Sequence, residues 1–346
     1  MSDFTGFTLL NLPVVPGEDI IRLMTVQEQY KLATLSNVTR RVVKSASFTE
    51  KMEWMISYTG VVMINIKNHS RQNEYVYRLR PTPGTDFVQT VKDEIAFIRD
   101  VFNFSSLHLS FLDDTEPNLL FSVISFVKEL DINLDEVRIC SSVPSNIMNK
   151  ILLHECASAK DFKLTYEITG DFEMKFWECP KFKNKSIQIS EAQWIKSRIL
   201  NNCFMDCESV VLSKCDVSPS DLNSFLKKWI HGAALDEIII SLRQRVDRGA
   251  SMMDRVLRGI PADPINFARL YQYQKEFEDG TCFIIHQNSG KPAIVYQMNQ
   301  DFCLSTNFSL DLSEPDPEEL EIEFSVMIKH DEDFKPLAVN ARDDEY

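Results

Sequence analysis

The fold predicted from this chain is decided by residues 209–242, SVVLSKCDVSPSDLNSFLKKWIHGAALDEIIISL. The stretch begins with SVVLSKC and ends with EIIISL, two short runs of β-branched and aliphatic residues that are typical of buried strands. Between them, Lys227 and Lys228 fall on one side of a predicted helix, and Gly232 follows at a position suited to a helix end. The opposite side of that helix is apolar: Leu222, Phe225, Leu226, Trp229 and Ile230. The stretch therefore predicts a strand, a helix that packs on a sheet, and a second strand.

The same strand-then-helix pattern recurs from about residue 105 to residue 258. Strands are predicted to start near residues 106, 136, 162, 186, 209 and 237, so successive starts lie 23 to 30 residues apart. This spacing is in the range of leucine-rich repeats. One such unit cannot bury its own apolar face, so neighbouring units are expected to stack into a parallel sheet with helices outside. The prediction is a mixed α+β and α/β chain built on an irregular leucine-rich-repeat-like βα solenoid, with a doubly wound α/β sheet as the alternative.

Antiparallel strands are predicted on both sides of the repeats. Residues 54–66 (WMISYTGVVMINI) and 74–80 (EYVYRLR) predict two strands, and residues 87–102 (FVQTVKDEIAFIRDVF) predict a helix after them. At the other end, FARLYQYQKEF, TCFIIHQ, PAIVYQM and DFCLSTNF are separated by turn residues such as Asn288-Ser289-Gly290. These runs predict a β-meander over about residues 265–309, which closes the C-terminal edge of the sheet.

Residues 6–48, GFTLLNLPVVPGEDIIRLMTVQEQYKLATLSNVTRRVVKSASF, predict three short amphipathic helices. So small a unit buries too little surface to be a robust domain alone, and its apolar residues outnumber what a three-helix core can hide. Some of these apolar side chains are therefore expected to face a partner.

This stretch resembles an F-box, the module by which substrate receptors dock onto the Skp-type adaptor of SCF (cullin-RING) ubiquitin ligases. The resemblance rests on a Leu-Pro pair, an isoleucine seven residues beyond the proline, and the polar-basic run at residues 39–41. It implies that five side chains contact the adaptor: Leu12, Pro13, Ile20, Met24 and Leu32. Three positions depart from the family pattern, because Val26 stands where proline is usual, and Pro16 and Gly17 stand where aliphatic residues are commoner.

A second block, SPSDLNSFLKKWIHG at residues 218–232, resembles the signature of the type-two F-box-associated domain of the large nematode-expanded F-box family. Together the two resemblances imply an F-box at residues 6–48, an F-box-associated substrate-recognition domain at 51–309, and an acidic tail at 310–346. The chain is then expected to be a non-catalytic substrate-receptor subunit, with the adaptor, through it a cullin, and a target protein as partners. A ligase-independent protein-binding repeat protein with a degenerate F-box is the alternative, and an α/β enzyme is a third interpretation.

The target-binding surface is predicted from the solenoid geometry. In a βα solenoid the parallel strands line one extended face, which such proteins use for recognition. Polar residues that interrupt the apolar strands are candidates for outward positions on this face. They are His108, Arg138, Thr165 and Gln188.

Charge is distributed unevenly along the chain. The formal net charge is −14, and residues 311–346 hold thirteen Asp or Glu against three Lys or Arg. A polyanionic tail repels phosphate backbones and anionic lipids, which argues against nucleic acid and membranes as partners. The sequence has no apolar run long enough for a transmembrane helix and begins without a signal-peptide pattern. We therefore expect a cytoplasmic or nuclear protein whose eight cysteines stay reduced.

Motifs of catalytic sites are absent from the sequence. It contains no G-x-S-x-G, P-loop, G-x-G-x-x-G or H-E-x-x-H pattern, so no cofactor is expected. Cys203, Cys207 and Cys215 with His231 bear the ligand types that zinc prefers, but they form no Cys-x-x-Cys pair. We interpret these cysteines as small buried hydrophobic residues.

Overall fold

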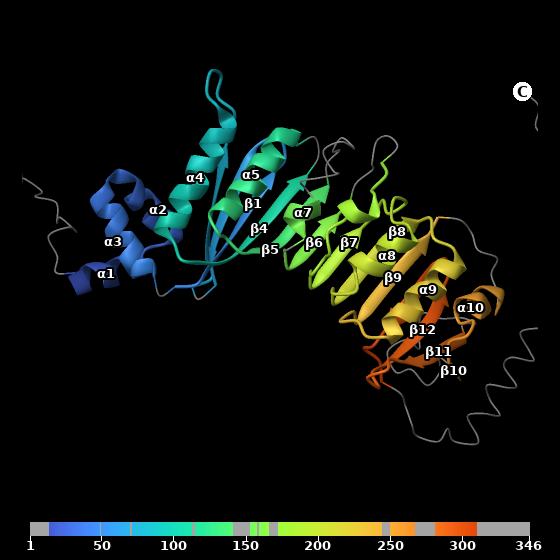
Figure 1. Cartoon of the computed structure of the whole chain (residues 1–346). Coiled ribbons are helices and arrows are strands. Elements are labelled where there is room, and N and C mark those ends of the chain that lie inside the picture. Colours follow the sequence, from blue (N-terminus) through green and yellow to red (C-terminus); the bar gives the residue numbers. More distant parts are fainter. Residues whose placement is uncertain are drawn as a thin grey trace, which may run out of the picture.

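Thirteen strands form one open sheet along the described part of the molecule (Figure 1). Their order is β10-β11-β12-β13-β9-β8-β7-β6-β5-β4-β1-β2-β3. The strands from β1 through β4 to β9 are parallel, and antiparallel strands flank them on both sides. The computed structural model describes residues 14–48, 50–69, 71–112, 115–140, 153–157, 159–165, 172–243, 250–266 and 281–309.

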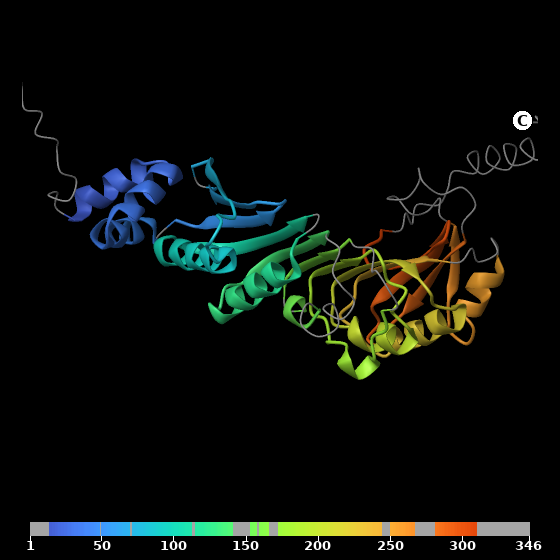
Figure 2. The same cartoon turned by 90° about the horizontal axis from the view of Figure 1, so that it is seen from above.

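From β4 to β9 the parallel strands follow chain order without a reversal. A doubly wound sheet contains a point at which the strand order reverses, and these strands have none. Figure 2 shows α4, α5, α8 and α9 on the same side of the sheet. The parallel strands are β1 Met52–Tyr58, β4 Phe104–Leu112, β5 Leu134–Cys140, β6 Asp161–Leu164, β7 Ser186–Ile189, β8 Ser209–Cys215 and β9 Glu237–Leu242. The helices are α4 Phe87–Val101, α5 Pro117–Glu129, α7 Leu153–Cys156, α8 Ser197–Cys203, α9 Pro219–Ile230 and α10 Ala250–Val256, with a 3₁₀ turn, η3, at Phe176–Glu178.

The predicted C-terminal meander is present among the described residues. It consists of β10 Asp263–Asn266, β11 Thr281–His286, β12 Pro292–Met298 and β13 Asp301–Ser305, and β13 pairs antiparallel with β9. The turn at Asn288-Ser289-Gly290 joins β11 to β12, as predicted. Strand β10 was not predicted; it contains Pro264 and lies at the sheet edge, where proline is tolerated. The run FARLYQYQKEF lies outside the described residues.

The N-terminal strand prediction was wrong in one respect. Residues 54–66 were predicted as one strand, but they contribute to two, because the chain turns back at Gly60 and forms the hairpin of β1 with β2 Val62–Asn68. Gly60 has φ of 78°, a left-handed conformation that glycine adopts without a Cβ clash. The strand β3 Asn73–Leu79 then completes this end of the sheet.

The main core lies between the sheet and its helices. In α9, Leu222, Phe225, Leu226 and Trp229 are fully buried, whereas Lys227 and Lys228 are exposed, as the helical spacing predicted. Ser218 caps this helix in a capping box with Asp221, and Gly232 after it has φ of 126°. After β7, helix α8 begins only at Ser197, although apolar residues start five positions earlier. The apolar side chains of Ala192, Trp194 and Ile195 are instead buried from the loop before it.

Three helices precede the sheet: α1 Val14–Leu23, α2 Val26–Leu35 and α3 Asn37–Ser47. Their number and position agree with the prediction for residues 6–48. Pro16 lies in the first turn of α1, where its missing N–H removes no helical hydrogen bond. Leu12, Pro13 and the acidic tail at 310–346 lie outside the described residues. No helix in the described ranges has the length and apolar character needed to cross a membrane.

Candidate functional site

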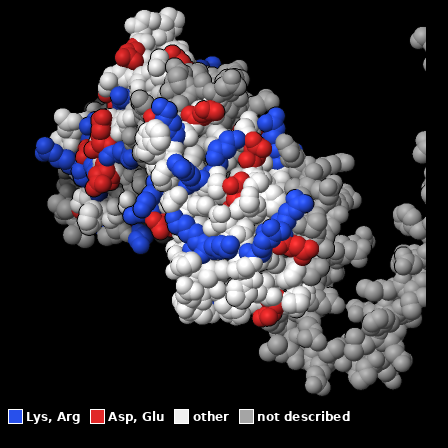
Figure 3. Space-filling view, turned by 45° about the vertical axis from the view of Figure 1, so that its right-hand side comes forward, with Lys and Arg blue, Asp and Glu red and all other residues white. Residues whose placement is uncertain are grey.

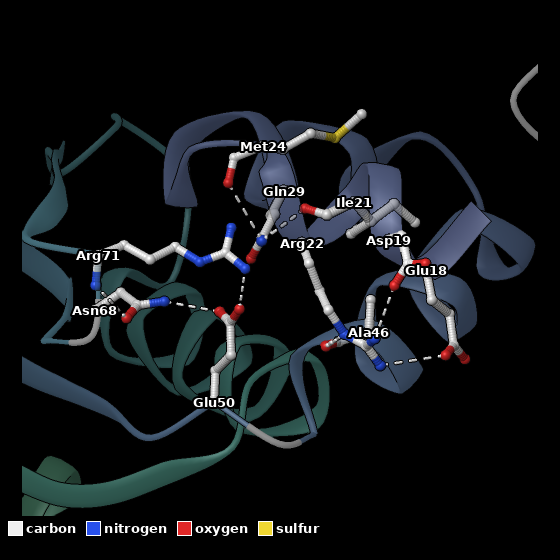
Figure 4. A network of polar contacts seen from close by, with 10 residues as sticks. All are labelled: Glu18, Asp19, Ile21, Arg22, Met24, Gln29, Ala46, Glu50, Asn68 and Arg71. Carbon is white, nitrogen blue, oxygen red and sulfur yellow. Dashed lines mark hydrogen bonds and ion pairs between the residues drawn. The ribbon is translucent and has the colours of Figure 1, made fainter. Parts of the chain in front are cut away.

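The three N-terminal helices form a module that polar contacts hold together (Figure 4). Buried Gln29 of α2 donates its side-chain amide to the carbonyl oxygen of Ile21 in α1 at 2.9 Å. Arg22 of α1 donates to the carbonyl oxygen of Ala46 in α3 at 3.2 Å and pairs with Asp19 at 3.1 Å. Each helix is thereby fixed to another, so the module presents a defined surface.

A second set of contacts fixes this module to the sheet. Glu50, just after α3, accepts a hydrogen bond from Asn68 of β2 at 2.7 Å and pairs with Arg71 (Figure 4). Ser47 of α3 donates to the carbonyl oxygen of Val101 in α4 at 2.9 Å. The guanidinium group of Arg40 lies over the ring of Phe97, 4.6 Å from its centroid. These contacts therefore fix the module to the sheet and to α4.

Several large apolar side chains of the module face solvent. Leu23 is 84% exposed at the end of α1, Leu35 is 74% exposed at the end of α2, and Val38 is 57% exposed at the start of α3. Ile20 of α1 is 36% exposed. These four side chains are the exposed apolar set, and they match the expectation that the module has more apolar residues than its core can hide.

The residues predicted to contact the adaptor divide into three groups. Ile20 belongs to the exposed apolar set. Met24 and Leu32 are half-buried and pack against the core, so only part of each side chain is accessible. Leu12 and Pro13 lie outside the described residues. The predicted contact residues did not include Leu23, Leu35 or Val38, although the apolar character of these three near helix ends was a usable signal.

The start of α2 shows how the chain accommodates one departure from the F-box pattern. Thr25 is the N-cap, and it exchanges two hydrogen bonds with Glu28 in a capping box. Val26 is the first helical residue and is buried. Proline is well suited to this first helical position. Valine here therefore keeps the same helix start, which Thr25 and Glu28 hold in place.

The four predicted target-binding residues all lie on the sheet face opposite the helices. In the strand register, His108 lies beside Glu136, Arg138 beside Lys163, and Lys163 beside Gln188. Thr165, directly after β6, is exposed and donates to the sulfur of Cys140 at 2.9 Å. The residues between them in the strands are buried on the helix side: Leu107, Leu109, Val137, Ile139, Phe162, Leu164, Ile187 and Ile189.

Glu136 is the centre of an ionic cluster on this open face. Its carboxylate lies 3.0 Å from Arg138, 3.0 Å from Lys163 and 3.4 Å from His108, and His108 also lies 2.9 Å from Glu53. Partial burial alone would raise the pKa of Glu136. The hydrogen bonds from Lys163, Arg138 and His108 outweigh this effect and lower the pKa to about 2. The open face thus carries a negative charge between two cations at neutral pH.

A groove of about 660 Å³ lies where the chain enters β5 to β9. Its charged lining residues are Asp135, Lys160, Lys183, Lys185, Asp206, Glu208 and Asp236. Burial would raise the pKa of Asp236, but hydrogen bonds from Lys291 and Thr306 lower it. The mixed charge favours neither an anionic nor a cationic ligand, and no serine, cysteine or histidine is among the lining residues.

Metal-ligating side chains do not converge in the described part of the chain, where no group of three or more His, Cys, Asp or Glu could hold an ion. Cys203, Cys207 and Cys215 are buried. Burial raises the pKa of the Cys207 and Cys215 thiols to about 12, which keeps them protonated at neutral pH.

Asn184 has a structural role that sequence reasoning missed. Its side chain is buried in the loop before β7, and its amide donates to the carbonyl oxygens of Cys156, at the end of α7, and Ala159, in the loop before β6. These bonds tie two successive strand-helix units together at one end. A lone asparagine among lysines gave no sequence signal that it would be buried.

Comparisons with known proteins support one part of the resemblance directly. Residues 179–236, which include the block at 218–232, match the family model described as F-box associated. The chain is also similar to the Skn-1 dependent zygotic transcript 15 protein of Caenorhabditis elegans, with 24% identity over 351 residues that cover 88% of this chain and 98% of the relative. No solved structure matches significantly. The predicted F-box-associated domain is therefore confirmed over residues 179–236.

Proposed function

We propose that this chain is the substrate-receptor subunit of an SCF-type ubiquitin ligase. In this proposal the module α1 to α3 is an F-box that docks the Skp-type adaptor, and the sheet domain captures a target protein. The observation that carries it is the exposed apolar set, Ile20, Leu23, Leu35 and Val38, on a three-helix module in a chain with an F-box-associated segment. Apolar side chains of this size on a fixed surface are the kind of anchor that protein interfaces bury.

The structure of the module supports adaptor binding over a degenerate F-box. Pro16 lies in the first turn of α1 and Val26 at the first position of α2, so neither departure interrupts a helix. The contacts of Gln29 and Arg22 keep the three helices in a fixed arrangement. A docking surface that is already formed loses little conformational entropy on binding.

We interpret the βα units as leucine-rich-repeat-like. The strands β4 to β9 follow chain order, and the helices α5, α8 and α9 lie on one side, which is the arrangement of stacked repeats (Figure 2). This interpretation assigns target capture to the opposite, open face with His108, Arg138, Thr165 and Gln188.

The receptor would act by proximity and not by chemistry of its own. Holding a target beside the ubiquitin-charged enzyme of the ligase raises its effective concentration there. The fixed contact between module and sheet supports this role, because a rigid receptor holds the target at one distance from the adaptor.

Co-purification with the adaptor and a cullin tests the proposal. Replacing Leu12 and Pro13 by alanine, or Leu23 and Leu35 by alanine, is expected to weaken adaptor capture by about thirtyfold or more, since a central anchor contributes ~2 kcal/mol. Val76→Ala is the matched control, because Val76 is 49% exposed but lies on β3 outside the module. Undetectable binding of the wild-type chain to adaptor would favour the ligase-independent alternative.

A further inference from the structure

The segment that leads into β7 carries an exposed aromatic pair on a fixed turn. Trp177 is 75% exposed and Phe176 is 38% exposed in η3. Lys175 places its ammonium group 5.7 Å from the centroid of the Trp177 ring. We call residues 175–179 the aromatic turn. Tryptophan is among the residues most often found as interface anchors, and this one is hardly covered by its own chain.

The aromatic turn is held rigidly from both sides. On the amino side, Phe172 is nearly buried and lies edge-on to Trp194, with ring centroids 5.4 Å apart. On the carboxyl side, Phe182 is fully buried and stacks on Phe204 at 5.0 Å. Within the turn, the N–H of Glu178 donates to the carbonyl oxygen of Lys175 at 2.9 Å. The two exposed rings are therefore presented in a fixed position.

Cations gather around this turn. A hydrogen bond from Cys179 lowers the pKa of the Cys203 thiol against the effect of burial, and the charges of Lys181 and Lys228 lower it further. Lys181 and Lys228 thus lie close to Cys203, which contacts Cys179 of the aromatic turn. Lys228 also donates to the side chain of Asn202. From residue 172 to 185 the chain holds four lysines and two glutamates. Figure 3 shows Lys and Arg side chains, with fewer Asp and Glu side chains among them, around uncharged surface on one side of the molecule.

The complementary sequence lies in the same chain. Residues 318–328 read EELEIEFSVMI, in which four glutamates alternate with or precede six large apolar residues. The segment combines negative charge with apolar side chains, whereas the turn combines positive charge with exposed aromatic rings. Residues 311–346 as a whole carry ten more negative than positive charges.

The chain that follows Ser309 is long enough for residues 318–328 to reach the aromatic turn. The last described residue, Ser309, follows β13, and β13 is separated from β7 only by β9 and β8. Three strand spacings amount to about 14 Å. The residues between Ser309 and Leu320, when extended, span about 36 Å. Tethering at such a distance gives an effective concentration of about 1 mM, so even weak affinity produces occupancy.

We propose that residues 318–328 of the C-terminal tail dock on the aromatic turn of the same chain, with Trp177 as the apolar anchor and Lys175, Lys181 and Lys228 as the cationic partners. The inference does not rest on the proposed function, because both elements belong to this chain. Its consequence is that a partner that uses Trp177 must first displace the tail.

Acrylamide quenching of tryptophan fluorescence in the full chain tests the proposal. The chain has four tryptophans, and Trp54, Trp194 and Trp229 are buried, so the quenching reports on Trp177. Replacing Glu318, Glu319, Glu321 and Glu323 by glutamine is expected to raise the quenching constant severalfold. Raising the salt concentration is expected to act in the same direction, because salt screens exposed charges.

Matched variants separate docking from general charge effects. Asp343→Asn with Asp344→Asn and Glu345→Gln neutralises the end of the tail and should leave quenching unchanged. Lys175→Glu with Lys181→Glu should raise the quenching constant as strongly as the replacement of the four glutamates by glutamine. A wild-type chain whose quenching equals that of the glutamine variant would overturn the proposal. Protection of Trp177 that increases with protein concentration would assign the tail to a second copy and would equally overturn docking within one chain.

Discussion

Tyr30 of α2 donates a hydrogen bond to the carboxylate of Glu94 in α4 at 2.8 Å, and Tyr77 of β3 donates to the same oxygen. The Tyr30 ring also lies 5.2, 5.0 and 5.6 Å from the rings of Tyr75, Tyr77 and Phe97. One carboxylate thus joins the helical module, the edge strand and the first helix of the sheet domain. The angle between module and sheet therefore depends on side chains that are far apart in sequence.

Replacing Glu94 by alanine should destabilise the protein by about 1–3 kcal/mol, because it leaves two partly buried phenols without their acceptor. Urea unfolding followed by circular dichroism measures the loss. Glu94→Gln keeps an acceptor oxygen and should lose less. Asp93→Ala is the control, since Asp93 is exposed on the same helix, and its effect should stay within about 0.5 kcal/mol. Equal effects of the two alanine variants would contradict the role of Glu94.

The same cluster predicts a loss of stability at alkaline pH. Burial, together with the charge and hydrogen bonding of Glu94, raises the pKa of Tyr30 and Tyr77 above the ordinary value of 10.0. In the unfolded chain both phenols ionise near that value. Their contribution to stability is therefore complete below pH 10 and decreases as the pH rises further. A variant with Tyr30→Phe and Tyr77→Phe should show a flatter decrease in unfolding free energy between pH 9 and 11 than the wild type.

Ile21 and Leu23 provide a test of which module side chains are structural. Ile21 is fully buried and Leu23 is 84% exposed, although both are aliphatic residues of α1. Ile21→Ala should lower the free energy of unfolding by about 2–5 kcal/mol, whereas Leu23→Ala should change it by less than about 0.5 kcal/mol. Thermal and urea unfolding measure both. A large loss for Leu23→Ala would show that this side chain is covered within the chain and is not available to a partner.

The parallel part of the fold was predictable because its signals are local. Each of the parallel strands β4 to β9 carries apolar residues at alternate positions, and α9 has a complete apolar stripe with a cap at Ser218 and a glycine at Gly232. Such patterns reflect burial on one side of a regular element, which a single sequence records directly. The outward position of His108, Arg138 and Gln188 followed from the same alternation.

The errors arose where tertiary contacts decide the structure. Gly60 ends one strand within an apolar run that otherwise looks continuous, and the side chains before α8 are buried from a loop. Asn184 is buried because two carbonyl groups of the preceding strand-helix unit, those of Cys156 and Ala159, accept its amide hydrogens. In the module, helical spacing did not separate Met24, which packs on the core, from Leu23, which does not. Whether an apolar helical residue faces the core or a partner depends on contacts with residues far away in the sequence, which the local pattern does not contain.

Asn184→Ala should therefore lower the free energy of unfolding more than most substitutions of polar residues do. The variant removes a buried side-chain donor from the carbonyl group of Ala159, while the carbonyl group of Cys156 keeps the N–H of Ala159, and we expect a loss of about 1–3 kcal/mol in unfolding free energy. Asn288→Ala, in the exposed turn between β11 and β12, is the control and should have little effect. Differential scanning fluorimetry of the three proteins measures the shifts in Tm. A Tm for Asn184→Ala that matches the control would mean that water replaces the amide without loss.

Glu136 should make the open sheet face sensitive to acid. Its pKa in the folded protein is about 2, below the ordinary value of 4.5, because the hydrogen bonds from Lys163, Arg138 and His108 outweigh its partial burial. A lowered pKa contributes stability that is complete above about pH 4.5 and is lost as the pH falls toward 2. Since the cluster is partly exposed, we expect a contribution of about 1 kcal/mol that decreases with salt.

The comparison of wild type with Glu136→Gln isolates this contribution. The difference in unfolding free energy should be largest at neutral pH and should shrink as the pH approaches 2, where the wild-type carboxyl group also becomes neutral. Glu129→Gln is the control, because Glu129 is an exposed acid at the end of α5 for which no ion pair is present among the described residues. Urea unfolding at pH 7, 4 and 3 gives the required values. A difference that is the same at all three pH values would show that Glu136 contributes through packing alone, and that its charge does not order Arg138 and Lys163 on the face proposed to capture the target.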